Sequence, residues 1–155
     1  MDKISSKIRV AIAGLGNCAG SLIEGLNYYR ERNTLDGLLF PILGGYFLNN
    51  IEIVCAFDIS VNKVGKSIRE AIYAQPNNFN KIDGVRVLEE GKVFRGPTLD
   101  GNPDHLKIFV KESNEKPVNV AETLERNRID ILANLLPTGS IEATKFYGNA
   151  AYEAK

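Results

Sequence analysis

Residues 7–25, KIRVAIAGLGNCAGSLIEG, constrain the fold of this chain more than any other stretch. The run from Ile8 to Ala13 is apolar, rich in β-branched residues and too short for a buried helix, which predicts a buried parallel strand. A glycine-rich turn follows at once, and beyond it apolar residues recur at helical spacing, which predicts a helix over residues 18–32. A strand, a tight turn and a helix in direct succession indicate the first unit of an α/β fold.

The turn, GLGNCA at residues 14–19, has the G-x-G-x-x-A spacing of a dinucleotide-binding fingerprint. Gly14 lets the chain leave the strand sharply, and Gly16, which has no Cβ, lets a pyrophosphate approach the backbone. Ala19, or Gly20 beside it, lets the helix and the strand pack closely. The free N–H groups of the first helical turn then face the phosphates. We therefore predict a dinucleotide site, with a turn that merely packs a helix onto a sheet as the alternative.

The charge balance of the chain excludes several classes of partner. In its 155 residues, 19 basic side chains balance 19 acidic ones, and 44% of the residues are hydrophobic. This balance provides no electrostatic footprint for nucleic acid or for an anionic membrane, and no apolar run approaches transmembrane length. We therefore predict no nucleic-acid partner and no membrane partner.

The two cysteines indicate the cellular compartment of the protein, and the single histidine gives no sign of catalysis. The polar start of the sequence shows no signal peptide, and Cys18 and Cys55 both fall in predicted core elements. Such cysteines indicate reduced thiols in a cytoplasmic protein rather than a disulfide framework. His105 is the only histidine and has no metal-spaced or nucleophilic partner nearby, so we predict a surface residue. The residues themselves predict no metal site and no catalytic group.

Residues 33–50, NTLDGLLFPILGGYFLNN, depart from a compact β-α-β unit. The segment mixes large apolar residues with glycines and a proline, and it has no clean period. We interpret it as an insertion that packs on another part of the domain, or on a subunit or domain outside this chain. An ordinary buried loop is the alternative.

A second buried strand is predicted over residues 51–57 and ends at Asp58. In dinucleotide folds an acidic residue at this point accepts hydrogen bonds from the adenosine ribose hydroxyls. The usual gap from the glycine turn is about twenty residues, and the insertion explains the longer gap here. A carboxylate repels a 2′-phosphate and no arginine follows closely, which favours NAD over NADP. A helix-capping or turn aspartate is the alternative interpretation.

The rest of the chain continues to alternate between helices and strands. Ser60 is placed to cap a helix over residues 61–74, and Ser140 is placed to cap one over residues 141–154. The other predicted elements are a hairpin or strand over residues 85–88 and 92–94, a helix over 104–111, a helix over 118–127 and a strand over 129–136.

These elements predict an α/β fold with a Rossmann-like, doubly wound parallel sheet. Such a sheet has about six strands, whereas only three or four are predicted here, so the sheet is truncated. The loop that begins at Asn134 lies at the carboxyl end of a strand, where open α/β sheets bind ligands. The amides of Asn77 and Asn78 either satisfy the local backbone or reach a sugar or nicotinamide group.

Five motifs in order resemble the archaeal and actinobacterial branch of the inositol-3-phosphate synthase (myo-inositol-1-phosphate synthase) family. They are GLGNCAGSLIEG, LGGYFLNNIEIVCAFDIS with KVGK two residues later, AQPNNF, RGPTLDG and NLLPTGSIEATKFY, and they cover nearly the whole chain. The resemblance implies an NAD-dependent isomerase that converts D-glucose 6-phosphate to 1D-myo-inositol 3-phosphate. The implied steps are oxidation, enolisation, intramolecular aldol cyclisation and reduction. A homotetramer serving inositol and phospholipid biosynthesis is implied as well.

The resemblance also implies which residues hold NAD. The glycine turn would line the pyrophosphate, and Asp58 would hold the adenosine ribose with its two successors near the adenine. Paired asparagines, a loop at the edge of the sheet and a loop under the nicotinamide half would complete the site. The implied residues are Gly14, Gly16, Asn17, Cys18, Ala19, Asp58, Ile59, Ser60, Asn77, Asn78, Thr98, Leu99, Asp100, Asn134, Leu135, Leu136, Pro137, Thr138 and Gly139.

Members of this family are more than twice as long as this chain, and their catalytic lysines lie in the part after residue 155. Lys63, Lys66 and Lys145 match none of them and are predicted to be surface charges on helices. We therefore interpret residues 1–155 as an incomplete NAD-binding domain of a synthase that acts on glucose 6-phosphate as a homo-oligomer. The alternatives are a stand-alone NAD-binding or partner-binding module and a different NAD-dependent dehydrogenase.

Overall fold

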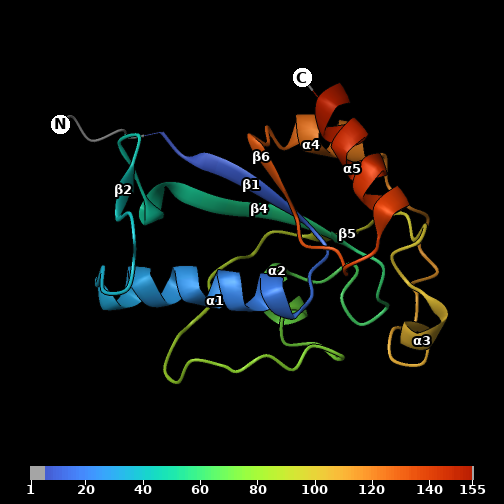
Figure 1. Ribbon diagram of the computed structural model, residues 1–155, viewed down its shortest axis with the longest axis horizontal. Helices are drawn as coiled ribbons and strands as arrows, with labels where there is room; N and C mark the ends of the chain where they lie inside the picture. Colours follow the sequence, from blue (N-terminus) through green and yellow to red (C-terminus); the bar gives the residue numbers. More distant parts are fainter. Residues whose placement is uncertain (1–5, 155) are drawn as a thin grey trace.

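A four-stranded parallel sheet forms the centre of the computed structural model, which describes residues 6–154 (Figure 1). Its strands are β1 (Ile8–Ala13), β4 (Ile51–Asp58), β5 (Val93–Arg95) and β6 (Ile131–Asn134). Their spatial order is β5-β4-β1-β6 and every pair is parallel. If the four strands are numbered in chain order, their order across the sheet is 3-2-1-4, which is the order of a doubly wound nucleotide-binding fold. The predicted fold class is confirmed.

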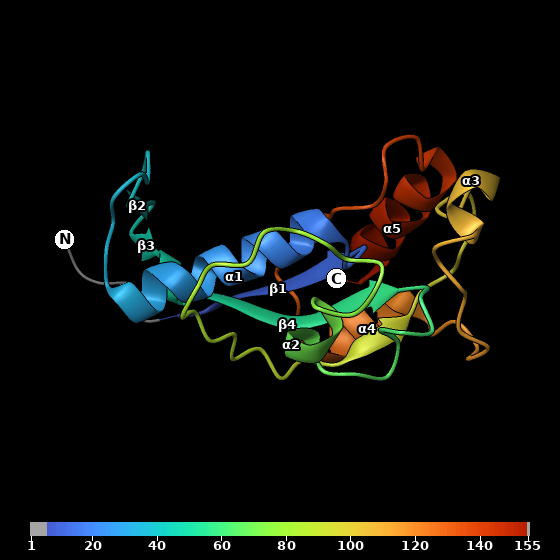
Figure 2. The same cartoon turned by 90° about the horizontal axis from the view of Figure 1, so that it is seen from below.

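Helices cover both faces of this sheet. The helices α1 (Asn17–Arg32) and α2 (Ile68–Ala71) pack on one face, and α4 (Val120–Arg126) and α5 (Ile141–Glu153) pack on the other (Figure 1). The short helix α3 (Asp104–Lys107) lies in the connection after β5, near α5 (Figure 2). Two hydrophobic layers result, one on each side of the sheet.

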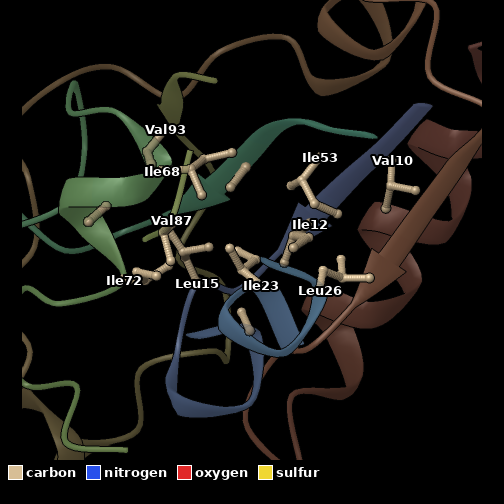
Figure 3. Packing of buried hydrophobic residues seen from close by; sticks show 13 residues of the cluster. Val10, Ile12, Leu15, Ile23, Leu26, Ile53, Ile68, Ile72, Val87 and Val93 are labelled. Atoms are coloured by element: carbon tan, nitrogen blue, oxygen red, sulfur yellow. The ribbon is translucent and has the colours of Figure 1, made fainter. Parts of the chain in front are cut away.

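The alternation of β1 divides its side chains between the two layers. Val10 and Ile12 pack toward α1, where Figure 3 shows them beside Ile23 and Leu26, whereas Ala11 and Ala13 belong to the layer under α4 and α5. A bulge in the pairing of β1 with β4 shifts the register after Val10. The buried residues of β4 are also divided between the two layers. A strand buried on both faces explains the continuous apolar run in the sequence.

The insertion at residues 33–50 forms a hairpin at the amino end of the sheet (Figure 2). The strands β2 (Ile42–Leu43) and β3 (Tyr46–Phe47) flank Gly44 and Gly45, whose φ values of 57° and 86° suit a tight two-residue turn. A short 3₁₀ helix, η1 (Leu48–Asn50), leads into β4. Because Leu39 is 84% exposed and Leu43 is 70% exposed, the interpretation as a buried loop is wrong. Contact with another subunit or domain stays a prediction.

The predicted helix over residues 61–74 is much shorter in the structure. Gly65 has a φ of +84° and its N–H donates to Val93 O, so residues 61–66 form turns beside β5. The α-helix begins after Ser67, whose side chain and backbone bond the Glu70 carboxylate in a capping box. Ser60 as the cap was therefore wrong, although Val64, Ile68 and Ile72, which recur at helical spacing, are buried.

Residues 85–88 form no strand, which corrects the hairpin prediction for that segment. The chain from residue 78 to residue 92 instead runs back along α1, whose polar side chains bind its backbone. Glu24, Asn27 and Glu31 accept hydrogen bonds from the N–H groups of Ile82, Leu88 and Arg86 in turn. These bonds replace a strand ladder, so only β5 forms. The predicted helix at 104–111 and strand at 129–136 exist but are shorter, as α3 and β6.

Of the two cysteines, only Cys55 lies in the core as predicted. Cys18 is exposed in the first turn of α1, which corrects its predicted burial. Burial raises the pKa of the Cys55 thiol to about 11, so it stays protonated and unreactive at neutral pH. His105 is exposed, as predicted. Across residues 6–154, every helix is too short or too polar to cross a bilayer.

Candidate functional site

The loops after β1, β4, β5 and β6 meet over a cavity of about 410 Å³ at the carboxyl edge of the sheet. This is the place where open α/β sheets bind ligands, and the volume lies in the range of small-molecule sites. The cavity collects many of the predicted site residues: Gly14, Gly16, Asn17, Cys18, Asp58, Ile59, Asn77, Thr98, Leu135, Leu136, Pro137 and Thr138.

The two glycines of the turn have different structural roles. Gly14 has a φ of +88°, and a Cβ on it would lie 2.9 Å from the carbonyl oxygen of Leu135. Any other residue there would be strained and would push against the loop after β6. Gly16 has an ordinary φ of −84°, and a Cβ built on it meets no atom within 4 Å. The absent side chain of Gly16 therefore leaves open space at the wall of the cavity.

The N-terminus of α1 faces this space without an anion of its own. Gly16 occupies the N-cap position, provides no capping side chain, and no acidic residue lies in the first turn. The first N–H groups of a helix have no partner inside the helix and lie at the positive end of its dipole. A 16-residue helix that begins beside a cavity in this way is suited to bind a phosphate group.

Asp58 ends β4 directly beside the glycine turn. Its carboxylate accepts hydrogen bonds from the N–H groups of Leu15 at 3.0 Å and of Ile59 and Ser60 at 2.8 Å each. The carboxylate thus holds the turn against the end of the second strand. A charged acceptor at this edge also provides the position at which an adenosine ribose is held in dinucleotide folds.

Lys63 lies inside the site, which corrects its prediction as a surface charge. The residue is only 4% exposed, and its ammonium donates to Leu15 O and to Asn77 Oδ1, both at 2.9 Å. The ammonium also lies 3.5 Å from the Asp58 carboxylate. The prediction failed because it assumed a helix, whereas the turns at residues 61–66 direct this side chain inward. Lys66 and Lys145 are exposed as predicted.

The paired asparagines both bind the glycine turn. Asn77 is buried, and its amide donates to Leu15 O at 3.0 Å and to Ile72 O at 2.9 Å. Asn78 is exposed and exchanges two hydrogen bonds with the side chain of Asn17, each 2.8 Å long. Asn77 lines the cavity, whereas Asn78 holds the start of α1 from outside it. Buried Ala19 and Ser60 also lie outside the lining.

The loop after β5 is organised around an ion pair. Buried Arg95 donates to Thr98 Oγ1 at 2.9 Å and to the Glu112 carboxylate at 3.1 Å. The Thr98 hydroxyl, the Asn102 amide and the Arg95 charge hold the pKa of Glu112 below its usual value, so this carboxylate stays ionised. Thr98 lines the cavity, whereas Leu99 lies outside the lining and is 52% exposed.

Asp100 lies outside the cavity lining and caps α5. Its carboxylate accepts the N–H groups of Glu142 and Ala143, both at 2.8 Å. Ser140 occupies the N-cap position as predicted, but its side chain makes no capping hydrogen bond. The bonds from Ala143 and Glu142 lower the pKa of the Asp100 carboxyl below its ordinary value of 3.8.

Asp100→Asn is expected to lower the Tm of the chain at neutral pH, because the charged cap of α5 is lost. Since the folded-state pKa is depressed, the stabilisation is complete above the unfolded value of 3.8 and disappears as pH falls through the folded value. The Tm difference between parent and variant should therefore shrink on acidification below that value. Thermal scans across pH check this. Glu142→Gln, which removes an exposed carboxylate from the first turn of α5, is the control. A Tm difference between the parent and Asp100→Asn that does not change with pH would contradict the role of Asp100 as the charged cap.

The loop after β6 closes the far wall of the cavity. Residues 135–138 line it, whereas Asn134 and Gly139 lie outside the lining. Asn134 instead donates to Thr144 Oγ1 at 2.9 Å and accepts the N–H of Leu136 at 3.2 Å, which fixes the loop against α5.

Sequence reasoning missed ten residues of the lining. Tyr147, on α5, is 2% exposed, and burial raises the pKa of its hydroxyl above the usual value, so it stays neutral. Helical periodicity alone identified α5 without indicating that its residues face a ligand. The lining residues that were not predicted are Phe57, Lys63, Pro76, Pro97, Gly101, Asn102, Leu106, Val110, Ala143 and Tyr147.

The described part of the chain holds no group of three or more histidine, cysteine or acidic side chains arranged to bind a metal ion. The cavity thus offers a helix N-terminus, a carboxylate and apolar walls. These groups suit a ligand with both phosphates and flat, apolar parts.

Known proteins match nearly the whole of this chain. The chain is 46% identical over 154 residues to the inositol-3-phosphate synthase of Corynebacterium glutamicum, covering 97% of this chain and 42% of that protein. It is 41% identical over 157 residues to the inositol-3-phosphate synthase of Mycolicibacterium smegmatis, covering 99% and 43%. Among solved structures, that of Ari2 superimposes with a TM-score of 0.79 at 30% identity, covering 96% of this chain and 44% of Ari2. No family model matches. The chain therefore spans well under half the length of these relatives.

Proposed function

Because this chain belongs to the inositol-3-phosphate synthase family, we propose that it is the NAD-binding portion of such an enzyme. The observation that supports this most directly is the cavity where the uncapped N-terminus of α1, the open space beside Gly16 and the Asp58 carboxylate meet. In dinucleotide folds these three features bind the pyrophosphate and the adenosine ribose.

The residues of the cavity fit the parts of the dinucleotide. The first turn of α1 would bind the pyrophosphate, and Asp58 with Ile59 would hold the adenosine ribose and adenine. The loop at residues 135–138, on the other side of β1, would lie under the nicotinamide half. Lys63 and Asn77 would hold the glycine turn in place by donating hydrogen bonds to Leu15 O.

Charge at the ribose position favours NAD over NADP. A 2′-phosphate would approach the Asp58 carboxylate, which lies at the end of β4. An ammonium has three donors, and Lys63 directs them toward Leu15, Asn77 and Asp58. No cationic donor of this cluster remains for the additional phosphate.

Calorimetric titration of the chain with NAD and then NADP tests this proposal. We expect NAD to bind more tightly by at least about tenfold, because a like charge at the ribose disfavours NADP. Asp58→Asn should weaken NAD binding and narrow the ratio of the two affinities, since the repelling charge is gone.

Asp36→Asn, on an exposed loop away from the cavity, is the matched control and should bind as the parent does. Equal affinity of the parent for the two dinucleotides would contradict the role of Asp58. Absence of NAD binding by a folded chain would contradict the proposed NAD site.

For the longer protein, we propose isomerisation of glucose 6-phosphate to inositol 3-phosphate. Bound NAD would supply a hydride acceptor. The residues of this chain would position NAD and exclude water from the cavity walls that contact its bases. We assign the transfer of the substrate's protons to the part of the relatives that this chain does not cover. Production of inositol phosphate from glucose 6-phosphate by a protein that contains this chain and that part is the test.

A further inference from the structure

Asn102, in the loop after β5, holds a polar atom for which the fold provides no partner. The residue is 5% exposed and lines the cavity. Within residues 6–154, its Oδ1 is the one buried side-chain nitrogen or oxygen without a hydrogen bond. An unpaired buried acceptor is destabilising, and each one in a folded protein calls for an explanation.

The neighbours of Asn102 determine which way its amide points. The Nδ2 group donates to Glu112 Oε1 at 3.2 Å and to Val110 O at 3.4 Å, and both of these atoms can only accept. Turning the amide over would place its oxygen against an ionised carboxylate and a carbonyl. Glu112 is itself held by Arg95 and Thr98. The unpaired atom is therefore an acceptor and requires a donor.

The position of the loop identifies the part of the ligand that Asn102 faces. In the sheet, β5 lies beside β4 on the side away from β1, so this loop continues the wall that begins at Asp58. The loop after β6 lies on the other side of β1. Asn102 therefore lies on the adenosine side, where the apolar side chains of Ile59, Leu106 and Val110 also line the cavity and suit a flat base.

We propose that Asn102 is the residue that recognises the base, its Oδ1 accepting a hydrogen bond from the exocyclic amine of adenine, an assignment that rests on the proposed NAD site. Adenine carries a donor at this position, whereas hypoxanthine carries a carbonyl oxygen. The site would accept the first and reject the second, because two acceptors would face each other in a buried place.

Titration of the unaltered chain with NAD and with nicotinamide hypoxanthine dinucleotide tests the proposal without a substitution. We expect NAD to bind about 30-fold more tightly. Asn102→Ala should lose most of that preference, so that the two affinities agree within about threefold. Asn149→Ala, on the exposed face of α5, should keep the preference of the parent.

The outcomes separate this inference from the proposed function. Equal binding of the two dinucleotides by the parent would overturn the role of Asn102 and leave the NAD site in place. A preference that survives in a folded Asn102→Ala variant would overturn it as well, because another group would then recognise the amine. Failure to bind either dinucleotide would overturn the NAD site itself and this inference with it.

Discussion

Gly16→Asp is expected to weaken NAD binding by about 100-fold, or about 2.7 kcal/mol, while the chain remains as stable as before or becomes more stable. A Cβ at Gly16 meets no atom within 4 Å, and the backbone there has a φ of −84°, so folding tolerates a side chain. Aspartate is a favourable N-cap residue and its charge suits the helix dipole. The same carboxylate would occupy the space proposed for the pyrophosphate and repel it.

Two variants separate charge, space and folding in this test. Gly16→Asn fills the same space without the charge, so its smaller loss of NAD affinity measures the steric part. Gly14→Ala should instead destabilise the chain by about 2 kcal/mol or more, because Gly14 has a φ of +88° and its Cβ would lie 2.9 Å from Leu135 O. Calorimetry and urea unfolding provide the two readouts. Undiminished NAD affinity in Gly16→Asp would contradict the phosphate site at α1.

Lys63→Met is expected to lower the free energy of unfolding by about 3 kcal/mol. The substitution keeps the length of the side chain and removes the ammonium that bonds Leu15 O and Asn77 Oδ1. It also removes the cation 3.5 Å from the buried Asp58 carboxylate. Asn77 Oδ1 would then lack its donor, and the Asp58 carboxylate would keep its backbone donors but lose its cation. Inside the protein this is more destabilising than the loss of a surface ion pair. Urea unfolding of parent and variant measures the difference.

The chain offers a matched control for Lys63. Lys66→Met makes the same chemical change at an exposed lysine on the same turn, and its unfolding free energy should stay within about 0.5 kcal/mol of the parent. The double variant Lys63→Met with Asp58→Asn should recover part of the loss, since both charges of the pair are then absent. Equal effects of Lys63→Met and Lys66→Met would show that the buried cluster does not stabilise the turn.

Prediction from the sequence succeeded where structure is decided locally. The strand Ile8–Ala13, the turn at Gly14 and the helix ending at Arg32 lie at the predicted positions, because an apolar run, two glycines and a helical repeat are sufficient to specify them. The helix over residues 61–74 was over-extended for the opposite reason. Its apolar spacing is genuine, but backbone hydrogen bonds from Gly65 to Val93 and from Ile68 to Gly91 replace its first turns.

The same distinction holds for the candidate site. The glycine turn, Asp58 and the loop at residues 135–138 were predicted because they follow strands directly, and parallel strands bring their carboxyl ends to one edge. Asp100 was assigned to the cofactor on the motif around it, and in the structure it caps α5 by accepting the N–H of Glu142, 42 residues further along. No local pattern distinguishes those two roles of an aspartate in a loop.

The sequence by itself determined the α/β class, the dinucleotide-type turn and the edge of the sheet where a ligand would lie. These follow from hydrophobic periodicity and from the conformational freedom of glycine, which depend on neighbours along the chain. Only the tertiary structure decided that Lys63 is buried beneath the turn and that Asn102 holds an unpaired acceptor at the cavity. Their environments come from segments far apart in sequence, such as Leu15, which lies 48 residues before Lys63. Burial makes the hydrogen bonds of such polar groups important for stability, because a buried polar group without a partner is destabilising.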